Sequence, residues 1–219
     1  MNKETILKKV RSHTQYHVKD GSLVPGVTTV LNVLAKPALI PWANRMGLQG
    51  IDTTKYVDSK AEIGTIAHYL IQCDLTGAKP DLSEYAPVQV DAAENSFLKW
   101  LNWKEGHKLN LIKSEAAMIS EHWRYGGTID IFCDLDDKRT LLDIKTSGSG
   151  IWPEMRHQVA AYWQLLLENE YDVEQVIIVR VGRDDKEGFQ TEVVGQLAEH
   201  LQLFIHALEI YKLQKKLEK

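Results

Sequence analysis

Charged side chains interrupt two strand-like runs in the middle of the chain. Residues 126–146 read GGTIDIFCDLDDKRTLLDIKT, in which apolar and polar positions alternate on either side of the acidic turn DLDDK. Because successive side chains of a strand point to opposite faces, Asp143 and Lys145 share one face, and their apolar neighbours point into the core. If the two runs pair through the turn, Asp130 lies on the neighbouring strand, and its face can match that of Asp143.

This arrangement would gather two carboxylates and one ammonium in one small patch. Burying such charges without partners is costly, and a hard cation such as Mg²⁺ compensates them because it prefers oxygen ligands. Lys145 beside the metal could then orient or deprotonate a water molecule, or stabilise charge on a phosphate oxygen. A salt bridge on an exposed sheet face explains the spacing of the three residues equally well. The turn DLDDK lacks the glycine and the glutamate of a calcium loop, so we interpret it as a solvated turn.

Two residues elsewhere could complete a metal site. His68, in GTIAHYLIQ (64–72), lies on a predicted amphipathic helix. It could reach the metal as a neutral nitrogen ligand, or it could be an ordinary core histidine. Glu115, in KSEAAMI, lies on the strand before the Asp130 strand. It could join the acidic patch, or merely pair with Lys113.

A third feature follows the Lys145 strand. Gln158 and Tyr162, in HQVAAYWQLL, are four residues apart on a predicted helix and therefore share one face. A glutamine amide can bond a phosphate or a base edge, and a tyrosine can stack on a base or donate a hydrogen bond. Ordinary chemistry at a helix boundary explains this pair as well.

Changes in hydrophobic period predict the elements that position these residues. Strands are predicted at 109–119, 124–134, 140–146, 174–181 and 188–194, and helices at 27–35, 38–46, 55–76, 88–105, 153–168 and from Leu197 through Tyr211. A hairpin over 14–24, with a type I′ turn at Asp20-Gly21, precedes them. The order predicts an α/β fold, in which helices flank a mixed central β-sheet and further helices form an N-terminal elaboration.

The bulk composition narrows the class of protein. The chain has 219 residues, of which 44% are hydrophobic, and this size suits one globular domain. A net charge of −4 does not favour a passive nucleic-acid coat. The 2 cysteines cannot hold a four-cysteine zinc site or iron–sulfur cluster. No apolar run has the length of a membrane span, and the start lacks the pattern of a signal peptide, so we expect an intracellular, cytoplasmic protein without membrane partners.

Five motifs occur in a fixed order: G-T-x-x-H, S-E, G-G-T-I-D, L-D-I-K-T and Q-x-x-x-Y. In this order they resemble the PD-(D/E)xK nuclease superfamily, in its RecB-like exonuclease branch. The stretch VPGVTTVLNVLAKPALIPWA also resembles phage-type and mitochondrial genome maintenance members of that branch. The resemblance covers residues 16–181. Ile129 replaces the proline of the family name, and Gln72 stands where an acidic residue is common.

The resemblance implies a role for each residue of the patch. His68, Asp130 and Asp143 would be metal ligands, and the carbonyl of Ile144 would complete the coordination sphere. Lys145 would assist the attacking water and the developing charge on the phosphate.

The remaining motif residues would support the site or meet DNA. Glu115 would join the catalytic set, reaching a second metal through water. Gln158 and Tyr162 would support the site and contact DNA. Five further residues could lie near the DNA because of their positions in the sequence: Arg124, Thr146, Ser147, Trp152 and His157. For each of them a purely structural role is an equal alternative.

The activity that the resemblance implies is phosphodiester hydrolysis by a DNA exonuclease that uses one or two Mg²⁺ or Mn²⁺ ions and no iron–sulfur cluster. One nuclease domain would span residues 1–219, with a hairpin and helical part at 14–105 and a restriction-endonuclease-like core at 106–219. The expected partners are single- or double-stranded DNA ends, a second copy of the chain, or a replication or recombination protein; the setting would be phage or cellular. A non-catalytic DNA-binding module and a structure-specific endonuclease are the alternatives.

Overall fold

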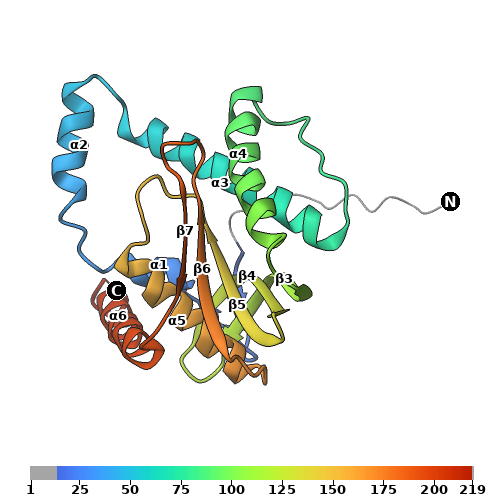
Figure 1. Ribbon diagram of the computed structural model, residues 1–219. Coiled ribbons are helices and arrows are strands. Elements are labelled where there is room, and N and C mark those ends of the chain that lie inside the picture. The colour runs from blue at the N-terminus through green and yellow to red at the C-terminus, as the bar shows by residue number, and fades with distance from the viewer. Residues whose placement is uncertain (1–13, 219) are drawn as a thin grey trace.

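The computed structural model describes residues 14–218, and a five-stranded mixed sheet forms its centre (Figure 1). The strand order is β3-β4-β5-β6-β7, and only the pairing of β5 with β6 is parallel. This arrangement confirms the predicted mixed sheet. The strands are β3 (Leu109–Ser120), β4 (Tyr125–Leu135), β5 (Lys138–Lys145), β6 (Gln175–Val181) and β7 (Phe189–Val193).

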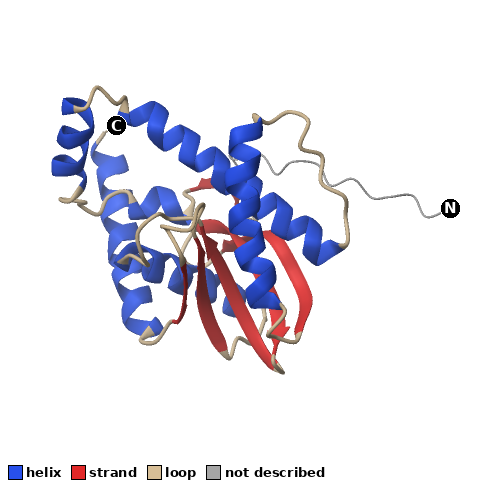
Figure 2. Ribbon diagram, turned by 45° about the horizontal axis from the view of Figure 1, so that its top comes forward, coloured by secondary structure: helices blue, strands red, loops and turns tan. Residues whose placement is uncertain are grey.

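Helices cover both faces of this sheet (Figures 1 and 2). One apolar cluster joins one face to α1, α5 and α6, and a second joins the other face to α3 and α4. The apolar stripe of α3 packs mainly on α4, and Ile71 is its buried contact with the sheet. The helices are α1 (Val27–Leu31), α2 (Leu39–Leu48), α3 (Thr53–Thr76), α4 (Pro87–Lys104), α5 (Pro153–Glu168) and α6 (Leu197–Leu217).

The parallel connection between β5 and β6 places one end of α5 next to the end of β5. Parallel neighbours need a crossover, and α5 supplies it, beginning at Pro153, whose missing N–H is harmless in a first helical turn. The loop that follows Lys145 therefore leads directly into the helix that carries Gln158 and Tyr162.

The hairpin before α1 exists, but its predicted type I′ turn at Asp20-Gly21 is wrong. β1 (Tyr16–His17) pairs with β2 (Leu23–Val24), and Gly21 alone in the turn has a positive φ, +82°. The N–H of Gly21 donates to the carbonyl of Val18, which fits a three-residue loop with a glycine bulge.

The type I′ geometry occurs instead between β4 and β5. Asp136 and Asp137 both have positive φ, 50° and 63°, between the paired residues Leu135 and Lys138. The carboxylate of Asp136 accepts the N–H of Lys108, which holds this acidic turn in place.

Two adjacent glycines in β4 let aromatic rings lie directly on the strand. A Cβ atom at Gly126 would come 2.3 Å from Cγ of Tyr16, and one at Gly127 would come 2.6 Å from Cε1 of Tyr162. Both distances are far inside van der Waals contact, so any side chain at these positions would displace a ring. The glycine pair of the motif GGTID therefore has a packing role.

We expect Gly127→Ala to destabilise the protein by about 2 kcal/mol or more, because the added methyl group overpacks a buried site. Urea unfolding followed by circular dichroism measures this change. Gly47→Ala is the matched control, since the added methyl group meets nothing within 4 Å on helix α2. An equal stability of the two variants would contradict the packing role of Gly127.

Across residues 14–218, no helix combines the length and the apolar character that crossing a bilayer requires.

Candidate active site

The site lies where β4 and β5 separate. Their ladder runs from Leu135–Lys138 to Ile131–Leu142, and the next residue along β4 is Asp130. Oδ2 of Asp130 accepts the backbone N–H of Ile144 at 2.7 Å, so a side chain replaces the ladder at this point. Ile129 and Ile131 belong to the apolar clusters on opposite faces of the sheet, so strand alternation is broken at Asp130.

Glu115 lies opposite this break, on β3. The ladder pairs Ser114 with Ile131 and Ala116 with Ile129, which sets Glu115 across from Asp130. The backbone of Glu115 has φ +47°, a left-handed conformation that is strained for a residue with a long side chain. Such strain in mid-strand re-aims the side chain toward its neighbours.

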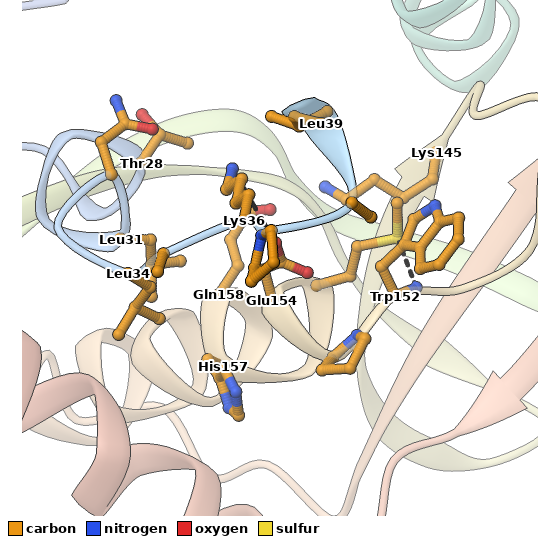
Figure 3. A pocket seen from close by; sticks show the side chains of 16 residues that line it. Thr28, Leu31, Leu34, Lys36, Leu39, Lys145, Trp152, Glu154, His157 and Gln158 are labelled. Carbon is orange, nitrogen blue, oxygen red and sulfur yellow. Dashed lines mark hydrogen bonds and ion pairs between the residues drawn. The ribbon is translucent and has the colours of Figure 1, made fainter. Parts of the chain in front are cut away.

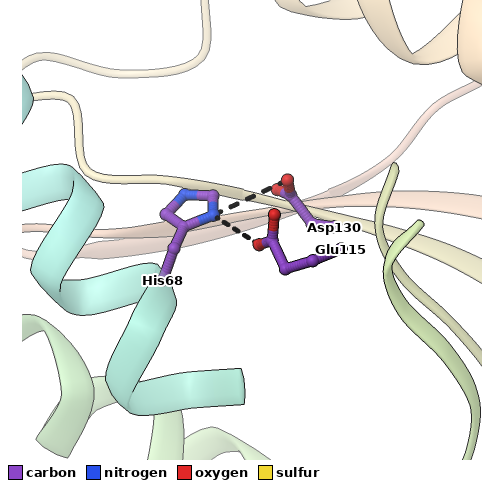
Figure 4. Close-up of side chains that lie close together, drawn as sticks. All are labelled: His68, Glu115 and Asp130. Carbon is purple, nitrogen blue, oxygen red and sulfur yellow. Dashed lines mark ion pairs between the residues drawn. The ribbon is translucent and has the colours of Figure 1, made fainter. Parts of the chain in front are cut away.

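His68 completes a three-residue cluster from helix α3 (Figure 4). Its Nδ1 lies 3.6 Å from Oε1 of Glu115 and 3.6 Å from Oδ1 of Asp130. These separations are too long for hydrogen bonds. Ligands about 2.1 Å from an octahedral Mg²⁺ are about 3.0 Å apart in cis and about 4.2 Å apart in trans, so both separations lie within the span of one coordination sphere. A ligand atom from each of the three residues lies within 4.8 Å of the others. Within the described residues, the ion pair of Glu115 is with His68 and not with Lys113.

Asp143 and Lys145 form an ion pair beside this cluster. Nζ of Lys145 lies 2.6 Å from Oδ2 of Asp143, whose side chain is 1% exposed. Oδ1 of Asp143 is buried without a hydrogen-bond partner in the described residues. A buried carboxylate oxygen without a donor is costly, and a cation would remove that cost. Asp143 is not one of the three clustered ligands, so its place in a coordination sphere stays a prediction.

The charges of the cluster control the protonation of His68. Burial alone would lower the pKa of the imidazole, but the carboxylates of Asp130 and Glu115 outweigh burial and raise the pKa to about 9. Burial raises the pKa of Asp130, against the opposing effect of His68 and Lys145. At neutral pH the metal-free cluster therefore holds a proton on His68.

The pKa values of both groups in the ion pair are raised, for different reasons. Burial raises the pKa of Asp143 to about 6, and the neighbouring Lys145 limits that rise. For Lys145, burial lowers the pKa, but Asp143 and Asp130 outweigh burial and raise it. A lysine with a raised pKa is a charged ammonium at neutral pH. The electrostatics therefore favour charge stabilisation by Lys145 over deprotonation of water.

Gln158 and Tyr162, on α5, form a hydrogen-bonded pair near Asp130 and Asp143. Nε2 of Gln158 donates to the hydroxyl oxygen of Tyr162 at 2.8 Å, and Tyr162 is only 6% exposed. Burial, together with Asp143 and Asp130, raises the pKa of the Tyr162 hydroxyl well above its usual value. The ring packs on Gly127 and is buried in the core, so neither of its faces is free to stack on a base. Gln158 lines the neighbouring groove and can still meet a ligand.

This groove has a volume of about 910 Å³ and opens beside Lys145 (Figure 3). One wall comes from α1 and the segment that leads into α2, and the other from the first turns of α5. Trp152, the N-cap residue of α5, is 49% exposed here, so its ring is accessible from the groove. Sequence reasoning missed Lys36, which lies in the groove near Glu154, since nothing in the local pattern links residue 36 to Lys145.

The other predicted DNA neighbours lie around the site. Thr146 approaches α3 closely, because a Cβ atom at Gly64 would be 2.9 Å from its hydroxyl oxygen. The hydroxyl of Ser147 donates to the carbonyl of Gly150, inside the loop after β5. Arg124 instead pairs with Asp20 of the N-terminal hairpin at 2.9 Å.

Comparisons with known proteins assign no family. No protein-family model matches the chain, and no curated protein matches it. A solved structure titled "Crystal structure of SSO0001" is 14% identical, with a TM-score of 0.32, and the match covers 73% of this chain and 87% of that one. A similarity of this size supports no statement about function.

Proposed function

We propose that the protein is a metal-dependent DNA exonuclease. The observation that carries this proposal is the meeting of His68, Glu115 and Asp130, from α3, β3 and β4, beside the pair of Asp143 and Lys145. Three carboxylates and one ammonium leave a net charge of −2 when His68 is neutral, and one divalent cation cancels it. Carboxylate oxygens suit Mg²⁺ and Mn²⁺, and the imidazole nitrogen is a better ligand for the transition metal Mn²⁺ than for the harder Mg²⁺.

His68, Glu115 and Asp130 would hold the ion, with Asp143 and the carbonyl of Ile144 as further ligands in the proposed assignment. When bound, the ion supplies Lewis-acid chemistry: it neutralises the scissile phosphate and lowers the pKa of water. A small cavity of about 10 Å³, whose lining includes His68, Glu115, Asp130 and Ile144, has room for little more than one ion or water.

Residues of the chain itself would orient the ligands of the ion and stabilise the charge that develops on the phosphate. The N–H of Ile144 fixes one oxygen of Asp130, which leaves the other oxygen facing His68. The ammonium of Lys145 stabilises negative charge as it gathers on the phosphate oxygens. The groove beside Lys145 would hold the strand, with Gln158 and Trp152 as contacts. Replication, recombination or repair of phage or cellular DNA would use such an activity.

Linear and covalently closed circular DNA test this function directly. With Mg²⁺, we expect wild-type protein to degrade end-labelled linear DNA and to leave closed circles intact, while Asp143→Ala degrades neither. Nicked circles would instead show an endonuclease. Binding of DNA with no cleavage by wild-type protein, in Mg²⁺ or Mn²⁺, would show a non-catalytic binding module.

His68→Ala is expected to raise the Mn²⁺ concentration that gives half-maximal activity, by roughly tenfold or more, because one ligand of the ion is lost. Titrations of Mn²⁺ at fixed DNA concentration measure the shift. His206→Ala, an exposed histidine on α6, is the control. The same titration midpoint in His68→Ala and wild-type protein would count against His68 as a ligand.

A further inference from the structure

A buried arginine lies next to the catalytic lysine of the proposed site. Arg180 is on β6, where the parallel ladder pairs it with Lys145 of β5. Paired positions on neighbouring strands have side chains on the same face of the sheet. Arg180 is only 6% exposed, so its side chain is almost wholly shielded from solvent.

The guanidinium is anchored at one nitrogen and unpaired at another. Nη1 donates to the backbone carbonyls of Ser147 and Glu187, at 3.2 and 2.6 Å. Nε is buried, and none of the residues from 14 to 218 supplies it with a hydrogen-bond partner. Within residues 14–218 Arg180 forms no ion pair with a carboxylate, in contrast to Arg156 and Arg183, which pair with Glu192 and Glu187.

A buried cation without a counterion is unfavourable for folding. Moving a charge out of water costs several kcal/mol unless a partner of opposite sign compensates it. Two neutral carbonyls orient the guanidinium but do not neutralise it. The edge formed by Nε and Nη2 is the fork that binds phosphate or carboxylate through two parallel hydrogen bonds.

We propose that Arg180 binds a backbone phosphate of the nucleic-acid strand, adjacent to the phosphate that Lys145 contacts. This inference rests on the proposed nuclease function and adds a residue that positions the strand. The two anchoring carbonyls come from the loop after Lys145 and from the turn between β6 and β7. They hold the guanidinium ready before the strand arrives, which reduces the entropy lost on binding.

Single-position removal of phosphate charge tests the contact. Single-stranded oligonucleotides would each carry one neutral methylphosphonate, and kcat/KM would be measured for wild type, Arg180→Met and Arg180→Lys. For wild type, kcat/KM is expected to fall about tenfold or more when the methylphosphonate stands at one position near the cleaved bond. A loss of this size is typical of a hydrogen bond between charged groups. Arg180→Met should show the same fall in kcat/KM with unmodified DNA, and no further fall when the methylphosphonate stands at that position. Arg180→Lys should recover part of it.

Arg139→Met is the matched control, because Arg139 lies at the far end of β5 in an exposed pair with Asp134. It should respond to the methylphosphonates as wild type does. If Arg180→Met instead adds the same penalty at every position, Arg180 only braces the loop, and the inference is overturned while the nuclease function stands.

A second measurement is independent of DNA cleavage. Sulfate is expected to raise the thermal midpoint of wild type and Arg139→Met more than that of Arg180→Met, because bound anion stabilises the folded state. If wild type shows this difference but cleaves no DNA, the anion site stands and the nuclease proposal fails. Equal responses of all three proteins to sulfate would overturn the anion site.

Discussion

Lys145→Ala is expected to slow DNA hydrolysis by about 10²- to 10³-fold while DNA affinity stays close to that of wild type. The ammonium lies 2.6 Å from Asp143 and carries its charge at neutral pH. Its stabilisation grows as charge gathers on the phosphate in the transition state, so kcat should fall far more than binding. Single-turnover cleavage and equilibrium binding of the same labelled oligonucleotide separate the two effects.

Two controls make this result specific. Lys212→Ala, which removes a partly exposed lysine on α6 that pairs with Glu209, should leave both rate and affinity unchanged. The Mn²⁺ midpoint of Lys145→Ala should not rise, because removing a positive charge favours a nearby cation. A near-normal rate in Lys145→Ala would remove Lys145 from the mechanism, and a parallel loss of affinity would make it a binding residue.

The fold could be predicted from sequence because its signals are local. The helix 153–168 has its predicted bounds, and the hairpin of β4 and β5 follows from alternation around an acidic turn. The ion pair of Asp143 and Lys145 was predictable for the same reason, since residues two apart on a strand share a face. A type I′ turn was predicted at Asp20-Gly21 but occurs at Asp136-Asp137, for which only a solvated turn was predicted, so local signals for turn type are ambiguous.

The three-residue cluster needed information that no local pattern carries. His68 reaches Glu115 because α3 packs against the sheet. Glu115 points toward the cluster because its backbone is left-handed in the middle of β3. Asp130 lies at a break in alternation that its own run, TIDIF, does not indicate. The sequence therefore indicates these residues as candidates. Which of them meet depends on how α3, β3 and β4 pack together in the fold.

The local sequence around Arg180 does indicate an unusual residue, but the sequence-based predictions did not use it. The strand VIIVRV carries one charge in a run that is otherwise buried and apolar. A charged residue in a buried parallel strand needs a partner or a function. Its neighbour on β5 is set by the strand order, which became known only with the structure.

The affinity for Mn²⁺ is expected to rise about tenfold per pH unit between pH 6.5 and 8, because the ion must displace one proton from His68. The neighbouring carboxylates raise the pKa of His68 to about 9, so it is protonated throughout this range in the metal-free protein. Asp143, whose pKa is raised to about 6, is ionised there and adds a second displaced proton only at lower pH. Calorimetric titration in buffers of different ionisation enthalpy gives both the affinity and the number of protons released.

The same pKa values set the stability of the metal-free protein. A carboxyl whose pKa is raised on folding favours the folded state when protonated, so stability should fall as pH rises from about 4 through 6 as Asp143 ionises. His68 favours the folded state when charged, and its contribution should be lost as pH rises through about 9. Mn²⁺ should offset both losses, because it replaces the positive charge that the protons supplied.

His68→Gln separates these effects, because it keeps a polar side chain but removes the titrating group. Its Mn²⁺ affinity should be lower and nearly independent of pH between 6.5 and 8, with close to no proton released. Asp143→Asn should keep the slope in that range, since Asp143 is already ionised there, and should lose the stability change near pH 6. A slope of tenfold per unit that persists in His68→Gln would mean that the displaced proton comes from another group, and the ligand role of His68 would have to be abandoned.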